Sequence, residues 1–134
     1  MANYLLDTNH LSPLVTLSHP LRGRILRQNE SGDNFATCVP SVTETLFGLR
    51  LLPRATQNLQ EWVRLKSLFR CHIPDLLDAE EAAGLQVFLR QRGWQLDTVD
   101  ALIAAVALRH DLTLLTTDRD FQAVPQLRTE NWLV

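Results

Sequence analysis

The chain has 134 residues, of which 46% are hydrophobic and 21% are charged, a size and composition that allow one hydrophobic core to form without disulfides. This composition excludes intrinsic disorder, and we expect a single domain spanning residues 1–134. The formal net charge of −2 argues against a protein held on nucleic acid by an overall basic surface.

The pattern of apolar residues disfavours membrane and secreted proteins. No apolar run reaches the roughly 18 to 20 residues that span a bilayer, and the N-terminus lacks the basic segment and long apolar run of a signal peptide. We therefore expect a cytoplasmic protein that does not associate with a membrane. Cys38 and Cys71 lie in short apolar runs without CxxC spacing, which favours buried free thiols over a zinc site that includes His72.

The first half of the chain alternates short apolar runs, which predict strands, with segments of helical period. The predicted elements are a strand at residues 4–6, two short helices within 11–28, a strand at 35–39, and two helices around 46–52 and 57–69 joined at Pro53. After Pro40, the spacing Ser41-x-x-Glu44 matches a capping box and predicts the start of a helix.

The second half continues this alternation. The predicted elements are a strand at 71–73, a helix capped by Asp78-x-x-Glu81 that ends at Arg92-Gly93, a helix from Asp97 or Thr98 to Leu108, a strand at 112–115, and a final short strand near 127–129 or 132–134. The helix that ends at Leu108 is apolar all round, so it must be buried. Strands that alternate with helices, without hairpin signals, predict an α/β fold with a parallel sheet covered on both faces.

Four carboxylates each stand where an apolar run gives way to a turn or helix: Asp7, Glu44, Asp100 and Asp118. In a parallel α/β sheet the carboxyl ends of the strands face one edge, so these acids can meet in one crevice. Crowded negative charges need a cation, and oxygen ligands without a matching set of His and Cys favour Mg²⁺ or Mn²⁺. The sequence therefore predicts a divalent-metal site.

Each acid also has a purely structural interpretation. Asp7 and Asp100 can cap or begin helices, Glu44 fits the capping box, and Asp118 can stabilise a turn. Capping alone would place acids at any helix start, whereas a shared site predicts them after the central strands. We therefore favour the shared site.

Several short polar residues accompany the four acids. Asp120 is a weaker candidate for the site, and Asp97 is interpreted as the N-cap of the Asp100 helix. Thr8, Asn9 and Thr116 are suited to orienting carboxylates or bound water, with turn formation as the alternative. His10 is given no catalytic role.

The basic residues are almost all arginine. Arginine pairs with phosphate through two parallel hydrogen bonds and stacks on bases, although exposed arginines also serve solubility. Two groups, Arg22/Arg24/Arg27 and Arg64/Lys66/Arg70, are candidates for a rim that contacts a nucleic-acid backbone.

In four segments the chain resembles the PIN-domain nucleases, specifically the VapC-type toxins of bacterial toxin–antitoxin pairs. The matching segments are Tyr4-Leu-Leu-Asp7-Thr-Asn9, Ser41-Val-Thr-Glu44 with Gly48-Leu49, Asp100-Ala-Leu-Ile-Ala-Ala, and Thr116-Thr-Asp118-Arg-Asp120-Phe121. By position, the acids Asp7, Glu44, Asp100 and Asp118 match the family's acidic quartet. Asp118 stands where many members have Asn, and Asp120 matches a further acid that recurs in such toxins.

This resemblance implies a five-stranded parallel sheet flanked by helices, forming a single PIN domain. It also implies an Mg²⁺- or Mn²⁺-dependent endoribonuclease that acts on RNA, a cognate VapB-type antitoxin that covers the site, and a toxin homodimer. The predicted helices around 46–52 and 59–68 carry more apolar residues, including Phe47 and Trp62, than a short hairpin must bury. We expect a groove there for an antitoxin helix, with closure of the domain core or of a dimer as the alternative.

Three other functions are alternatives to a nuclease. A haloacid-dehalogenase-like phosphatase needs a second Asp two residues after the first, where this chain has Asn9. A nucleotide-binding module needs a glycine-rich turn after the first strand, and none is present, so we expect no nucleotide cofactor. A catalytically silent PIN-fold binding module is the third alternative.

Overall fold

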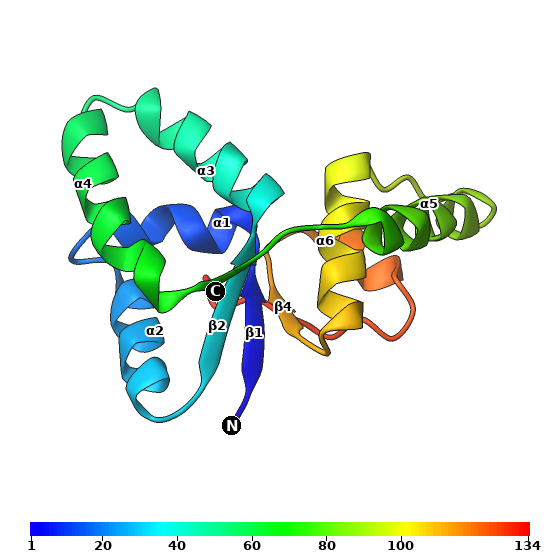
Figure 1. Cartoon of the computed structure of the whole chain (residues 1–134), viewed down its shortest axis with the longest axis horizontal. Helices are drawn as coiled ribbons and strands as arrows, with labels where there is room; N and C mark the ends of the chain where they lie inside the picture. The colour runs from blue at the N-terminus through cyan, green and yellow to red at the C-terminus, as the bar shows by residue number, and fades with distance from the viewer.

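The computed structural model describes residues 1–134 and shows a parallel sheet between two layers of helices (Figure 1). The five strands are β1 (Asn3–Leu6), β2 (Asn34–Cys38), β3 (Arg70–His72), β4 (Thr113–Leu115) and β5 (Thr129–Glu130). They lie in the order β3-β2-β1-β4-β5, and every neighbouring pair is parallel. The predicted α/β fold is confirmed, with β1 at the centre of the sheet.

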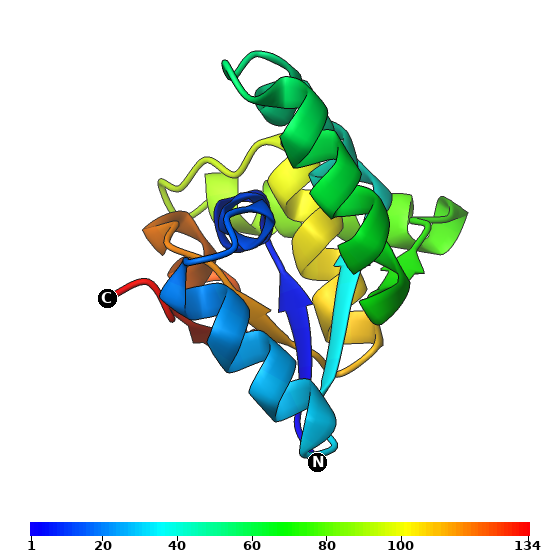
Figure 2. The same ribbon diagram turned by 90° about the vertical axis from the view of Figure 1, so that its left-hand side faces the viewer.

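The helices are grouped by face of the sheet. They are α1 (Thr8–Leu11), α2 (Pro20–Glu30), α3 (Val39–Arg50), α4 (Ala55–Leu65), α5 (Leu76–Arg90) and α6 (Thr98–Arg109), with short 3₁₀ turns at Ser12–Val15, Lys66–Leu68 and Arg119–Ala123. Helices α1, α2 and α4 lie on one side of the strands, and α5 and α6 lie on the other (Figures 1 and 2). None of these helices combines the length and the apolar character needed to span a bilayer.

Alternation along β1 divides the core between the two faces. Tyr4 and Leu6 pack in a cluster with α2 and α4, whereas Leu5 packs in a second cluster with α6. Helix α6 is buried along most of its length, as its apolar sequence predicts. Because both faces of β1 pack against helices, the position of Asp7, the residue that follows β1, is fixed by the core on both sides of the sheet.

Two predicted capping boxes are wrong. Helix α3 begins at Val39, before Ser41, and its N-cap Cys38 makes no side-chain hydrogen bond. Pro40 fits the first turn of a helix, which allows the helix to start directly at the end of β2 and leaves Glu44 inside it. Helix α5 begins at Leu76, because Asp75 and Asp78 form the capping box three residues earlier than predicted.

The remaining differences concern the edge strands. The last strand, β5, overlaps the first of the two predicted positions at Thr129 and extends one residue beyond it. Cys38 is buried and free as expected, whereas Cys71 is exposed because it lies on the edge strand β3. The zinc alternative is not supported, since His72 stacks on the His110 ring, at 4.1 Å between centroids, and forms no metal-binding group with the cysteines.

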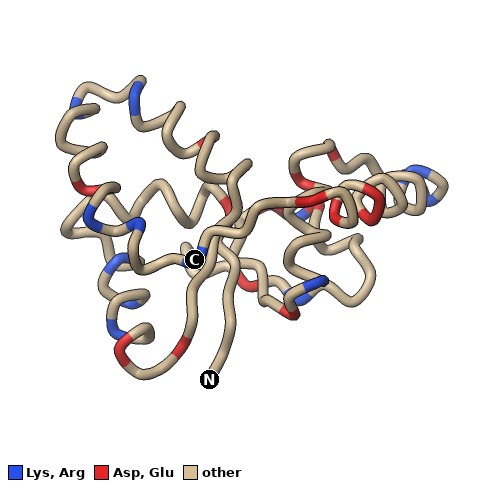
Figure 3. Tube along the Cα trace, viewed as in Figure 1, with Lys and Arg blue, Asp and Glu red and all other residues tan.

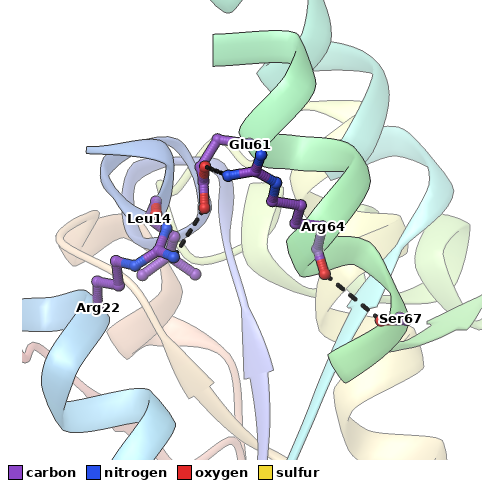
Figure 4. A network of polar contacts seen from close by, with 5 residues as sticks. All are labelled: Leu14, Arg22, Glu61, Arg64 and Ser67. Carbon is purple, nitrogen blue, oxygen red and sulfur yellow. Dashed lines mark hydrogen bonds and ion pairs between the residues drawn. The ribbon is translucent and has the colours of Figure 1, made fainter. Parts of the chain in front are cut away.

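Glu61 on α4 is a buried carboxylate that joins α4 to α2 (Figure 4). It accepts hydrogen bonds from Arg22 Nη2 at 2.7 Å and from Arg64 Nη1 at 3.3 Å. Arg22 also donates to the backbone carbonyl of Leu14 at 2.8 Å. The Arg22 and Glu61 side chains are only 16% and 9% exposed, so either charge alone would be poorly solvated.

We expect Arg22→Met and Glu61→Leu each to lower the free energy of unfolding by about 3 kcal/mol, because each leaves the other charge without its main partner. The double variant will lose clearly less than the sum of the two, since it removes both charges together. Urea unfolding of the four proteins forms a double-mutant cycle that measures this coupling. Strictly additive losses would show that the pair does not act as a unit.

Candidate active site

Asp7 follows β1 and occupies the centre of the candidate site. Its backbone N–H continues the sheet by donating to the carbonyl of Leu115 at 3.0 Å, which ties the ends of β1 and β4 together. Asp7 Oδ1 accepts the backbone N–H of Thr8 at 2.8 Å, and Oδ2 accepts the Thr116 hydroxyl at 2.8 Å. The side chain is only 5% exposed, and burial raises its pKa above the ordinary value, against the lowering effect of these hydrogen bonds.

The loop after β4 brings the second group of acids to Asp7. The Thr116 hydroxyl, which donates to Asp7, also accepts the backbone N–H of Asp118 at 3.0 Å. Asp118 Oδ1 in turn accepts the backbone N–H of Asp120 at 2.9 Å and caps the following 3₁₀ turn. A single chain of hydrogen bonds therefore runs from the end of β1 through the loop after β4.

Glu44 reaches the same edge of the sheet from α3. The Thr8 hydroxyl donates to Glu44 Oε1 at 3.3 Å, although the two residues lie 36 positions apart in the chain. Glu44 takes this position because α3 begins at the end of β2 and its first turns lie beside α1. The displaced helix start thus explains why Glu44 faces the site.

Asp100 enters from the first turn of α6, on the other side of the sheet. Its backbone N–H is capped by Asp97 Oδ1 at 2.8 Å, as the sequence predicts. The pKa of Asp100 is raised to about 7, first by burial and then by the negative charges of four other acids: Asp97, Asp7, Asp118 and Glu44. The other three members of the predicted quartet therefore lie close enough to Asp100 to raise its pKa through their negative charges.

The structure brings together all eight residues that the sequence singled out: Asp7, Glu44, Asp100, Asp118, Asp120, Thr8, Asn9 and Thr116. The structural interpretation also holds in part, because Asp7 and Asp118 both cap the segments that follow them. Capping and convergence are compatible, since each cap fixes the direction of a carboxylate at the same edge. Asp97 is an N-cap, and it also adds negative charge near Asp100.

His10 is a residue that sequence reasoning missed. It is fully buried, its Nδ1 lies 2.6 Å from Asn9 Oδ1, and its Nε2 accepts the backbone N–H of Trp132 at 3.0 Å. These partners require the neutral tautomer with the proton on Nδ1, and burial lowers the pKa of His10 to about 4. Asn9 in turn donates to Asp7 Oδ2 at 3.3 Å. The only signal in the sequence was the position of His10 directly after Asn9.

The chemistry of these donors fits a hard divalent cation. The site offers carboxylate and hydroxyl oxygens. A cation would relieve the repulsion among the acids, which adds to the effect of burial in raising the pKa of Asp100. No three His, Cys, Asp or Glu side chains lie close enough together to bind one ion jointly. Mg²⁺ commonly keeps several waters and uses only one or two carboxylates, so this spacing suits it.

The first predicted arginine group does not form a free rim. Arg22 is paired with buried Glu61, and the Arg24 guanidinium lies 3.7 Å above the Trp132 ring. In the second group, Arg64 is 75% exposed and is held by Glu61 at 3.3 Å. Arg22 and Arg24 are therefore engaged within the fold, whereas Arg27, Lys66 and Arg70 are exposed and stay candidates for such a rim.

The comparisons with known proteins identify the family of this fold. A family model described as PIN domain matches residues 4–127. The structure of VapBC2 from Rickettsia felis bound to a DNA fragment from their promoter contains a similar chain, 22% identical with a TM-score of 0.84, and the match covers 97% of this chain and 98% of that chain. A toxin–antitoxin complex from Klebsiella pneumoniae contains a chain 26% identical, with a TM-score of 0.63 and coverage of 91% and 92%.

A third similar structure is VapC20 from Mycobacterium tuberculosis, described as a sarcin-ricin loop cleaving toxin. It is 19% identical with a TM-score of 0.66, and the match covers 91% of this chain and 95% of that chain. Among curated proteins, none matches this sequence. The structural likenesses establish the same fold, and the family model spans nearly the whole sequence. The chain therefore belongs to the PIN domain family.

Proposed function

We propose that the chain is a metal-dependent endoribonuclease and the toxin of a VapBC-type toxin–antitoxin pair. The observation that carries this proposal is the convergence of Asp7, Glu44, Asp100 and Asp118 at one edge of the sheet. The names of two similar proteins support it, because one is a toxin that cleaves the sarcin-ricin loop and the other belongs to a toxin–antitoxin complex. The substrate that we infer is RNA, cut at a phosphodiester bond.

The proposed metal ligands are the same four carboxylates, with Mg²⁺ or Mn²⁺ as the ion. Because no three of these side chains lie close enough to bind one ion jointly, one or two of them would bind it directly and the others through bound water. When bound, such an ion lowers the pKa of a coordinated water and neutralises charge on the phosphoryl oxygens. The chain's own residues have a preparatory role. Thr116 and Asn9 hold Asp7 Oδ2 from two directions, at 2.8 and 3.3 Å, so this carboxylate cannot rotate away when the site is empty of substrate.

The loop after β4 orients the remaining groups. Asp118 is fixed from its backbone by Thr116 and from its side chain by the N–H of Asp120. Thr117 N–H donates to Asn9 Oδ1 at 3.2 Å, which locks this loop onto the segment after β1. We infer that Asp120, which is exposed beside Asp100, contacts bound water at the edge of the site.

The alternatives have less support. Asn9 stands where a haloacid-dehalogenase-like phosphatase needs its second Asp, and its amide is already engaged with Asp7 and Thr116. A catalytically silent binding module offers no reason for acids from four chain segments to lie at one edge of the sheet.

The proposed partner is a VapB-type antitoxin. Phe47 on α3 is 68% exposed, and Leu51 and Leu52 beyond it are 71% and 51% exposed, whereas Trp62 is buried in the domain core. Exposed apolar side chains of this kind suit an amphipathic helix from a partner. We also propose that the toxin forms a homodimer, which the exposed Leu76 and Val87 on α5 support.

Asp100→Asn will lower Mg²⁺-dependent cleavage of RNA by more than about 100-fold, because even the partners of metal ligands cost 10- to 100-fold when they are removed. The measurement is mapping of 5′ ends in total RNA after brief induction of the intact chain and of the variant. Glu80→Gln, which removes an exposed carboxylate from α5, is the matched control and will cleave normally. Equal cleavage by the Asp100→Asn variant, or cleavage that persists in chelator, would contradict the proposal.

The free energy of unfolding in chelator will fall as the pH rises from about 4 to 7. The pKa of the Asp100 carboxyl is 3.8 when the group is free in water, as in the unfolded chain, and about 7 in the folded protein. The folded protein therefore binds this proton more tightly, and the stability gained from it is lost as the pH rises and the carboxyl deprotonates. Asp100→Asn will remove the loss and be more stable by roughly 1 to 2 kcal/mol at pH 8, a figure reduced for partial exposure. Urea unfolding at several pH values measures this. Parallel pH curves for the two proteins would contradict the raised pKa of Asp100.

Phe47→Asp will abolish copurification with the small protein encoded next to the toxin, because a charge on the apolar face of α3 cannot be buried against a partner helix. Ile73→Asp, at an exposed apolar position after β3 and outside α3 and α4, is the matched control and will copurify normally. Pull-down of the co-expressed pair measures binding. Full copurification of the Phe47 variant would place the partner on a different surface.

A further inference from the structure

A cleft of about 420 Å³ adjoins the acidic site on the α5–α6 side. Its walls come from the end of α5, the segment that joins α5 to α6, and the first turn of α6. Asp100 and Asp120 line this cleft together with Arg90 and Trp94. A molecule bound to the acids would therefore also meet one cation and one aromatic ring.

Trp94 is unusual among the tryptophans of this chain. It is 49% exposed, whereas Trp62 and Trp132 are 8% and 9% exposed within the core. Helix α5 ends at Arg90, and Gly93, with a φ of 82°, turns the chain so that Trp94 N–H donates to the carbonyl of Leu89 at 2.9 Å. The backbone of Trp94 is thus anchored while its ring remains accessible from the cleft.

Arg90 supplies a free cation beside this ring. It is exposed in the last turn of α5, and it takes part in none of the ion pairs of the structure. Basic positions gather at this far end of α5 (Figure 3). An unpaired guanidinium close to the proposed metal site can form a bidentate ion pair with a phosphate group.

A second cleft adjoins the loop after β4 and shares no lining residue with the cleft of Trp94. Its lining includes Thr116, Thr117, Asp118 and Arg119. Each cleft thus has an arginine near an acid of the site, whereas an exposed tryptophan lines only the α5–α6 cleft. The two clefts would therefore contact a bound strand differently.

We propose that the α5–α6 cleft binds one unpaired nucleotide of single-stranded RNA next to the bond that is cut, with its base stacked on Trp94 and its phosphate paired with Arg90. This inference rests on the proposed nuclease function. Stacking on an aromatic side chain requires a base whose face is free, which excludes a nucleotide inside a duplex. The stack tolerates every base, so the cleft contributes affinity and direction, and it does not read sequence.

The test measures binding of a short single-stranded oligoribonucleotide to the full chain that carries Asp100→Asn. Tryptophan fluorescence reports the binding. Because Trp94 is the exposed tryptophan, binding will quench the accessible part of the emission. Trp94→Ala will weaken binding about 5- to 100-fold, the range for loss of one base stack, and Trp94→Phe will keep most of it.

Arg90→Gln will weaken binding and reduce its salt dependence. Arg54→Gln, which replaces an exposed arginine of a different cleft, will change neither.

The outcomes separate the two proposals. If the intact chain cleaves RNA with Mg²⁺ while Trp94→Ala binds and cleaves as well as the parent, the cleft is not a nucleotide site and the nuclease function stands. If the intact chain does not cleave RNA, the nuclease function fails, whatever the fluorescence shows. Equal quenching by a duplex of the same sequence would also overturn the inference. An unchanged unfolding midpoint will show that loss of binding in Trp94→Ala is not loss of the fold.

Discussion

The gathering of partly buried carboxylates at one edge of the sheet is the constraint on which the proposed site depends. Four chain segments place acids at the edge where β1 and β4 end, and burial, together with the charges of these acids, raises the pKa of Asp100 to about 7. Negative charges gathered in this way repel one another. A bound cation removes this repulsion, which strengthens its binding. Functional sites commonly contain such strain.

The surrounding structure holds these charges in place through neutral groups. Thr116 and Asn9 hold Asp7, and buried His10 holds Asn9 while it accepts a hydrogen bond from the backbone of Trp132. The C-terminal segment is itself held by aromatic contacts of Trp132 with Tyr4 and Phe35. A network without positive charge can orient a carboxylate without neutralising it, so the site keeps its attraction for a cation.

Much of the fold and of the site could be predicted from the sequence because both depend on periodic patterns. The apolar run before Asp7 and the all-round apolar helix after Asp100 predict a central strand and a buried helix, and both are confirmed. Parallel topology then places acids from distant positions at one edge. The errors occurred where local rules compete, since Pro40 starts α3 before Ser41 and Asp75 caps α5 before Asp78.

Other features depend on partners that no local pattern reveals. The role of His10 follows from a contact with Trp132, 122 positions away, and the pairing of Arg22 with Glu61 spans 39 positions. Arg22 therefore looked in the sequence like a cation for a nucleic acid, although its charge is used inside the fold. The exposure of Trp94 is likewise set by the turn at Gly93 and by its place beside α6.

The most direct test of this account is anomalous diffraction from crystals of the intact chain soaked in Mn²⁺. The account predicts an anomalous peak in contact with the carboxylates of Asp7, Asp100 or Asp118, and its absence from crystals of the Asp100→Asn variant. A peak bound elsewhere, such as at the stacked His72 and His110, with the acidic edge empty at saturating Mn²⁺, would contradict it.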